Sequence, residues 1–320
     1  MPYRILCAAV LAFATAAPAL AQNYPARPVR FIVPFAPGGN TDVQGRLIAM
    51  KLSEKWGQQV VVDNRAGAGG TLGVEMLAKA PADGYTMALA SFGNILVGPS
   101  LFPKLAYDPL KDLAPLVLVS QPPGLLVVNP VLPVKTVADL IGYGKANPGK
   151  LNYGSAGNGT WNHLFAEHFK ALTGIQMTHI PYKGANLAVT DVMAGQIQLS
   201  FAPFPAAVPQ IKSGRLRVLG VTSMQRSPVL PEVPTIAESG LPGYSAATWF
   251  AMLAPAKTPQ PLIQKINADA NAVLALPEVK AAFAADGTEP AGGTPEQLRE
   301  SMRNGIAQWG KLVRELGIKL

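Results

Sequence analysis

Strand-like and helix-like stretches alternate along this chain from Val29 onward, and this order constrains the fold more than any other feature of the sequence. Val29 to Phe35 is a nearly continuous apolar run of strand length, which is typical of a buried parallel strand. The next stretch, Val43 to Trp56, places Leu47, Ile48 and Leu52 on one helical face. The repetition of this order predicts an α/β fold.

The rest of the chain continues the pattern. Further strands are expected at 59–62, 86–90, 113–120, 125–128, 151–155, 178–182, 197–201, 216–222 and 248–253. Further helices are expected at 72–80, 137–146, 161–172, 185–194, 261–274, 277–285 and 295–316. The last helix carries an apolar stripe, expected to face the core, with a partner-binding face as the alternative: Leu298, Met302, Ile306, Trp309, Val313 and Leu316. The length suits two lobes of ordinary domain size.

The first residues have the pattern of a secretory signal peptide. Arg4 supplies the positive charge, and an apolar run from Ile5 to Ala17 follows it. Ala19-Leu20-Ala21 has the small residues that signal peptidase cleaves after, so residues 1–21 are expected to be removed and the mature protein to be periplasmic. The run is shorter than the ~20 residues that a membrane-spanning helix needs, although a retained anchor is the alternative.

Composition excludes several classes of function. Cys7 is the single cysteine and lies in the expected signal peptide, so the mature chain has no thiol chemistry, and three histidines supply metal chemistry poorly. We therefore expect no cofactor and no metal. The net charge of +8 is dispersed, without the basic cluster of a nucleic-acid-binding surface. This charge is either a weak attraction for anionic solutes or ordinary solubility.

Two strand-to-helix turns are the strongest candidates for binding. Residues 33–42 read VPFAPGGNTD and residues 153–164 read YGSAGNGTWNHL. In both, an apolar strand ends in glycines and small polar residues just before a helix, where unpaired N–H groups and the helix dipole attract anions. Two such turns facing each other would make an anion site that needs no arginine.

Individual residues near these turns each have a structural and a functional interpretation. Thr41 and Asp42 either cap the first helix or face the ligand, and Ser155 and Thr160 are either turn residues or ligand contacts. Lys183 follows a strand and precedes a helix, which places it at a ligand-binding sheet edge or in solvent. Two aromatic residues are candidates for the cleft wall or the core: Phe35 and Phe201.

Known catalytic motifs are not matched. Neither turn has the lysine and hydroxyl ending of a P-loop or the glycine spacing of a dinucleotide fold. Ser155 lacks the Gly-x-Ser-x-Gly context of hydrolases, and His163, on the following helix, is expected to point elsewhere. His163 and His168 are five residues apart, which suits no shared metal ion. The chain is therefore expected not to be an enzyme, with a secreted serine hydrolase using Ser155 as the alternative.

Over nearly the whole mature chain, the sequence resembles the periplasmic solute-binding proteins of tripartite tricarboxylate transporters, the Bug family. The resemblance lies in 34–42 (PFAPGGNTD), 63–70 (DNRAGAGG), 83–86 (DGYT), 153–159 (YGSAGNG), 163–164 (HL), 181–184 (PYKG) and 217–219 (RVL). It implies a two-lobed Venus-flytrap fold of type II, with crossover strands near 125–128 and 248–253. Lobe one would comprise 22–124 and 249–320, and lobe two 125–248.

The resemblance also implies the ligand and its contacts. Members bind tricarboxylates, acidic amino acids, nicotinate, and aromatic or aliphatic dicarboxylates. In these proteins two turns bind a carboxylate of the ligand. The resemblance implies that the binding residues here are Gly39, Asn40, Thr41 and Asp42 in the first turn, and Ser155, Gly157, Asn158, Gly159 and Thr160 in the second. Ser91 lies at the expected cleft edge, and Phe92 beside it is expected to favour a flat or apolar ligand. The protein is expected to be a monomer whose membrane partner is a transporter or, alternatively, a sensor, and the carboxylate it binds stays open.

Overall fold

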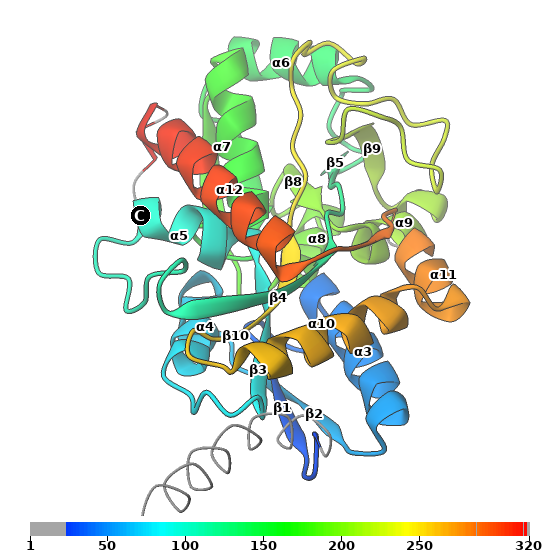
Figure 1. Ribbon diagram of the computed structural model, residues 1–320. Helices are drawn as coiled ribbons and strands as arrows, with labels where there is room; N and C mark the ends of the chain where they lie inside the picture. Colours follow the sequence, from blue (N-terminus) through cyan, green and yellow to red (C-terminus); the bar gives the residue numbers. More distant parts are fainter. Residues whose placement is uncertain (1–23, 286, 316, 319–320) are drawn as a thin grey trace, which may run out of the picture.

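Two mixed β-sheets with helices packed on them form the two lobes of the computed structural model (Figure 1). The structure describes residues 24–285, 287–315 and 317–318. The expected signal peptide and Leu316 lie outside these ranges. No helix within them is long and apolar enough to cross a membrane.

The first sheet has the strand order β11-β4-β10-β3-β1-β2. Strand β1 runs parallel to β2 and β3, whereas β10 runs antiparallel to β3 and β4. Phe31, Ile32 and Val33 of β1 are fully buried, as the apolar run predicted. The strands of this sheet are β1 (Val29–Val33), β2 (Val60–Asn64), β3 (Thr86–Ser91), β4 (Leu113–Ser120), β10 (Phe250–Pro255) and β11 (Pro290–Gly292).

Helices from both ends of the chain pack around this sheet. Helix α10 contacts α3 and β4, and α12 contacts β4, α5 and the segment η2. Leu298, Met302 and Val313 of α12 are buried, so its apolar stripe faces the core as expected. The elements are α3 (Asn40–Trp56), η1 (Ala68–Gly70), α4 (Thr71–Ala78), η2 (Gly93–Val97), α5 (Gly98–Leu101), α10 (Gln260–Leu274), α11 (Pro277–Ala285) and α12 (Pro295–Glu315).

The second sheet has the strand order β7-β6-β8-β5-β9. Strand β6 runs parallel to β7 and β8, and β5 runs antiparallel to β8 and β9. Its strands are β5 (Leu125–Val128), β6 (Leu151–Ser155), β7 (Met177–Pro181), β8 (Leu199–Ala202) and β9 (Arg217–Val221). Its helices are α6 (Val137–Ala146), α7 (Trp161–Thr173), α8 (Ala185–Met193) and α9 (Phe204–Lys212).

The chain crosses between the sheets twice. It leaves the first sheet after Ser120 and returns before Phe250, and the two crossing segments meet at a bridge between Pro123 and Ala247. The crossings were expected near 125–128 and 248–253, and they lie directly beside these stretches. All four residues of β5 pair within the second sheet, and β10 pairs within the first, so the crossings lie just before each strand.

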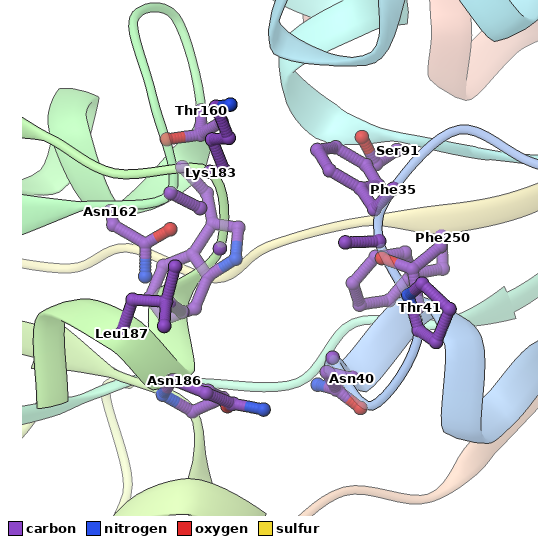
Figure 2. Close-up of a pocket in the computed structure, with 18 residues that line it drawn as sticks. Phe35, Asn40, Thr41, Ser91, Thr160, Asn162, Lys183, Asn186, Leu187 and Phe250 are labelled. Atoms are coloured by element: carbon purple, nitrogen blue, oxygen red, sulfur yellow. The ribbon is translucent and has the colours of Figure 1, made fainter. Parts of the chain in front are cut away.

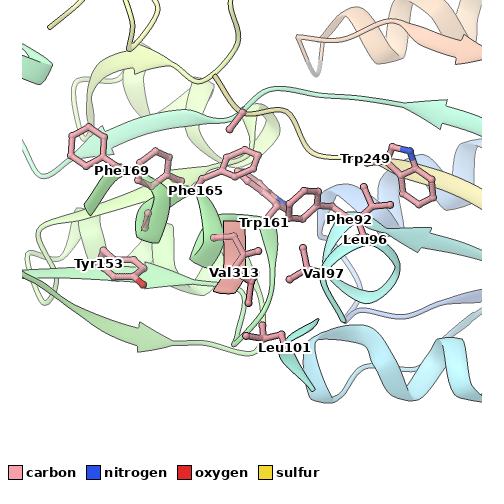
Figure 3. Packing of buried hydrophobic residues seen from close by; sticks show 14 of the residues in the cluster. Phe92, Leu96, Val97, Leu101, Tyr153, Trp161, Phe165, Phe169, Trp249 and Val313 are labelled. Carbon is pink, nitrogen blue, oxygen red and sulfur yellow. The ribbon is translucent and has the colours of Figure 1, made fainter. Parts of the chain in front are cut away.

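Aromatic rings from both lobes lie in one buried cluster (Figure 3), and Trp309 of α12 packs against it. Phe92, which follows β3, lies 4.5 Å from the Trp309 ring and 5.9 Å from the Phe165 ring, both in edge-to-face geometry. Phe165 of α7 also contacts Trp161 at 5.2 Å. Figure 1 shows α12 lying alongside α7, as these contacts require. One hydrophobic core therefore continues from the first lobe into the second.

Replacing Phe92 with alanine is expected to lower the free energy of unfolding by about 3–5 kcal/mol, because it leaves a cavity among rings from both lobes. Urea denaturation monitored by tryptophan fluorescence and circular dichroism measures this. The control is Met224→Ala, whose side chain is 69% exposed and whose loss should change stability by no more than about 0.5 kcal/mol. Equal effects of the two substitutions would contradict the assignment of Phe92 to the core.

Candidate ligand-binding site

A cavity of about 410 Å³ lies between the two lobes. Figure 2 shows residues of the first lobe on one side of it and residues of the second lobe on the other. The apolar part of its wall includes Phe35, Pro37, Trp161, Leu187, Pro203 and Phe250. The polar part includes Asn40, Thr41, Ser91, Thr160, Asn162, Lys183 and Asn186. The cavity therefore suits a small molecule with an apolar body and a few polar groups.

Three helices begin at the wall of this cavity: α3, α7 and α8. None of the three has a side-chain cap, since Gly39 and Gly184 have no side chain and the Thr160 hydroxyl donates back to the Gly157 carbonyl, 2.7 Å away. Helix α6, away from the cavity, instead has a complete capping box formed by Thr136 and Asp139. The first N–H groups of a helix have no partner inside it, so three uncapped N-termini offer one anion several donors.

The first turn is held in shape by Asp42, the third residue of α3. Its carboxylate accepts hydrogen bonds from the Gly38 N–H at 2.9 Å, from Arg46 at 2.9 Å and from Asn64 at 2.8 Å. Burial opposes ionisation of this carboxyl, but the bonds from Arg46, Gly38 and Asn64 outweigh it and lower its pKa. Asp42 therefore stays ionised and braces the turn from behind, and it does not line the cavity.

The second turn is held by its own hydroxyls and by two histidines. Ser155 Oγ accepts the Gly157 N–H at 3.0 Å and lies 2.6 Å from His179 Nε2. The Gly159 N–H donates to His163 Nδ1 at 3.2 Å. Gly157 and Gly159 have φ of 122° and 75°, which residues with a Cβ adopt only with strain. The glycines are thus needed for the path of this turn.

The lobes touch directly beside the cavity. Asn186 Nδ2 of α8 donates to the Gly38 carbonyl of the first turn at 2.8 Å. A Cβ atom placed on Gly93 would lie 2.5 Å from the Gly159 carbonyl oxygen, and one on Gly69 would lie 2.7 Å from that of Asn158. These backbone approaches require glycine in the first lobe. The cleft is therefore closed in this structure.

The structure separates the expected binding residues into three groups. Seven line the cavity: Phe35, Gly39, Asn40, Thr41, Ser91, Thr160 and Lys183. Gly157 and Asn158 line a neighbouring cavity of about 570 Å³ that shares Phe35, Ala36, Ala156 and Lys183 with the first. Asp42, Ser155 and Gly159 are buried behind the turns and line neither cavity.

Two aromatic expectations need correction. Phe201 is fully buried on β8, with its ring 6.0 Å from Phe169 and 6.4 Å from Tyr244, so its side chain belongs to the core of the second lobe. Phe92 is 1% exposed and also lies in the core, whereas its neighbour Ser91 lines the cavity. Asn94 bonds to the backbone and the hydroxyl of Ser91, which fixes that hydroxyl at the wall.

The pairing of Ser155 with His179 resembles part of a hydrolase site, but its position does not suit catalysis. His179 was not singled out in the sequence, because it lies on the next strand, 24 residues away from Ser155. Ser155 is fully buried and already bonded to Gly157, so its oxygen faces the inside of the turn and not a cavity. The pair therefore stabilises the turn.

Sequence reasoning also missed several wall residues. Trp161 and Asn162 directly follow Thr160, and their place in the first turn of α7 could have identified them. Phe250 and Leu187 carried no such signal, since only the tertiary fold brings β10 and α8 to the cavity. Asn162 Nδ2 donates to the Phe201 carbonyl at 2.6 Å, which leaves the buried Asn162 Oδ1 without a hydrogen-bond partner among the described residues.

Comparisons with known proteins agree on one family. Residues 45–318 match the model of the tripartite tricarboxylate transporter family receptor, TctC. The chain is 44% identical over 306 residues to Protein BugT of Bordetella pertussis, covering 95% of this chain and 94% of that protein. It is 40% identical over 316 residues to a UPF0065 protein of Pseudomonas sp. strain P51, covering 98% and 94% of the two chains.

Solved structures support the same assignment. Rpa4515 of R. palustris with adipate superimposes with a TM-score of 0.89 at 38% identity, covering 92% of this chain and 99% of that one. MatC of Rhodopseudomonas palustris with bound malate superimposes with a TM-score of 0.86 at 31% identity, covering 91% of this chain and 100% of that one. These matches confirm the two-lobed periplasmic-binding-protein fold and a family of binding proteins, not enzymes. The chain belongs to the TctC (Bug) family of tripartite tricarboxylate transporter receptors.

Proposed function

We propose that this solute-binding protein captures a small carboxylate in the cavity between its lobes and delivers it to the membrane subunits of a tripartite tricarboxylate-type transporter. The observation that carries the proposal is the convergence of three uncapped helix N-termini, those of α3, α7 and α8, on one cavity with an otherwise largely apolar wall. The protein acts as a monomer in the periplasm after cleavage behind Ala21.

The wall favours a mono- or dicarboxylate with an apolar body. Lys183 is the one charged side chain among the described residues that line the cavity, so a second carboxylate has one cationic partner and a third has none. Phe35, Trp161 and Phe250 supply apolar surface for a hydrocarbon chain or a ring. The relatives bound to adipate and malate, both dicarboxylates, support this class.

Ligand binding is coupled to closure of the lobes. Lobe one comprises residues 22–124 and 249–320, and lobe two comprises residues 125–248. Because the cavity wall draws on both, a bound carboxylate bridges them and stabilises the closed state over an open one. The closed form is then the one that the membrane partner recognises.

Thermal unfolding with a panel of mono-, di- and tricarboxylates tests the ligand class. A ligand at about 100 times its dissociation constant adds about 2.7 kcal/mol. At roughly 2–4 °C per kcal/mol, adipate or an aromatic monocarboxylate should raise the melting temperature by about 5 °C or more. Citrate serves as the tricarboxylate comparison and should give a smaller shift. A larger shift with citrate would contradict the ligand class, and no shift with any acid on ligand-free, refolded protein would contradict carboxylate binding.

Gly93→Ala is expected to weaken carboxylate binding by about 5- to 100-fold, because the added methyl meets the Gly159 carbonyl only when the lobes are closed. An open state relieves this clash, so the stability of ligand-free protein should change much less. Isothermal titration calorimetry and urea denaturation measure the two effects. Gly142→Ala is the control, since its Cβ meets no atom within 4 Å and should leave affinity unchanged. Unaltered affinity in Gly93→Ala would argue against closure.

A further inference from the structure

Two imidazole rings stack directly behind the second ligand turn. His163 of α7 and His179 of β7 have ring centroids 4.1 Å apart and planes inclined by 18°. His179 also stacks on the Tyr153 ring at 4.9 Å, its cross-strand neighbour on β6. Neither histidine lines the cavity, so direct ligand contact does not explain them.

Each histidine bonds to a different part of the turn. His179 Nε2 lies 2.6 Å from Ser155 Oγ, and that oxygen accepts the Gly157 N–H. His163 Nδ1 accepts the Gly159 N–H at 3.2 Å, which requires the His163 proton to be on Nε2. Together they fix both ends of residues 155–159, next to the start of α7.

The first turn contains the same brace with a different side chain. Asp42 and His163 are both the third residue of their helix, and each accepts the N–H of the residue that precedes the cap, Gly38 or Gly159. A carboxylate performs this role in the first turn, where Arg46 neutralises it. A neutral imidazole performs it in the second turn, and therefore adds no negative charge beside an anionic ligand.

We propose that His163 and His179 are positioning residues that hold the second turn in its ligand-binding conformation. Protonation of His163 in acid makes the second turn lose this conformation, whereas the first turn keeps its own. The proposal rests on carboxylate binding at this cavity. Protonation of His163 would replace its acceptor by a second N–H facing the Gly159 N–H, so that bond would be lost.

The surroundings keep both rings neutral at ordinary pH. The pKa of each histidine is lowered to about 4, mainly by burial, and the proximity of His163 contributes to the shift of His179. Two other charged groups act on the pair: Glu167, which raises both pKa values and accepts the Tyr153 hydroxyl at 2.6 Å, and Lys170, which lowers them. Asp42 remains an acceptor over this range because its own pKa is lowered.

The sign of the effect on stability follows from these shifts. The unfolded chain takes up protons on histidine near pH 6.5, whereas the folded chain does so only near pH 4. Between these values the unfolded state binds more protons, so the free energy of unfolding falls as the pH is lowered. Lowering the pH therefore both breaks the hydrogen bond that supports the turn and lowers the free energy of unfolding.

Matched substitutions separate positioning from bulk stability. His163→Asn keeps an acceptor at the δ position and cannot titrate, whereas His163→Leu removes the acceptor. Near neutral pH, calorimetric titration with adipate should show about a tenfold weaker affinity for His163→Leu and near wild-type affinity for His163→Asn. His179→Gln, which keeps a polar group at the ε position, should likewise bind better than His179→Leu. His168→Gln is the control, since His168 lies on the same helix and stacks on Tyr244 instead.

The pH profile gives the decisive readout. Toward pH 4, the affinity of the wild type for adipate should fall more steeply than that of His163→Asn, because only the wild type protonates His163. Protonation of adipate itself affects both proteins equally, so it does not contribute to the difference. Unchanged affinity in His163→Leu, or parallel pH profiles, would overturn the proposal.

An NMR titration of ligand-free protein tests the turn independently of any ligand. The Gly159 amide resonance should move with the titration of His163 in the wild type and move much less in His163→Asn, where His179 alone of the pair still titrates. If these resonances behave as expected but no carboxylate binds the wild type, the proposed function fails and the positioning role stands. A Gly159 amide that does not respond in the wild type would overturn the positioning role itself.

Discussion

The unpaired N–H groups at the starts of α3, α7 and α8 are the interaction on which the rest of this structure depends. A carboxylate needs donors, and the cavity wall has one lysine and no arginine among its described residues, so the backbone N–H groups of the helix starts and a few hydroxyl and amide side chains must supply the rest. This requirement explains the glycines before the helices and the absence of a side-chain cap on any of the three. It also explains why two lobes are needed, since α3 belongs to one sheet and α7 and α8 to the other.

Donors alone do not make a site unless the turns that carry them are rigid. The first turn is held by an ionised aspartate with three hydrogen bonds, and the second by hydroxyls and two stacked histidines. The braces lie behind the turns, so they leave the N–H groups free for a ligand. Closure adds a third constraint, because Gly93 and Gly69 let the lobes approach backbone to backbone.

Sequence patterns identified most of the fold and seven of the residues that line the cavity. The alternation of strands and helices was sufficient for the α/β class, but α9 was missed because Pro205 and Pro209 argue against a helix. In the turns, Asn40, Thr41 and Thr160 line the cavity as expected. Asp42 and Ser155 are in the right turns but face inward, since a sequence gives the position of a side chain and not its direction.

The sequence by itself determined most of the elements, the two glycine-rich turns and the family resemblance, because local periodicity and turn chemistry act over short stretches of chain. Only the tertiary structure decided which residues meet at the cavity. Phe250 reaches it through the pairing of β10 with β3, and His179 reaches Ser155 because β7 lies beside β6. Phe92 and Phe201 were assigned to the core for the same reason: burial depends on neighbours distant in sequence, which packing alone brings together.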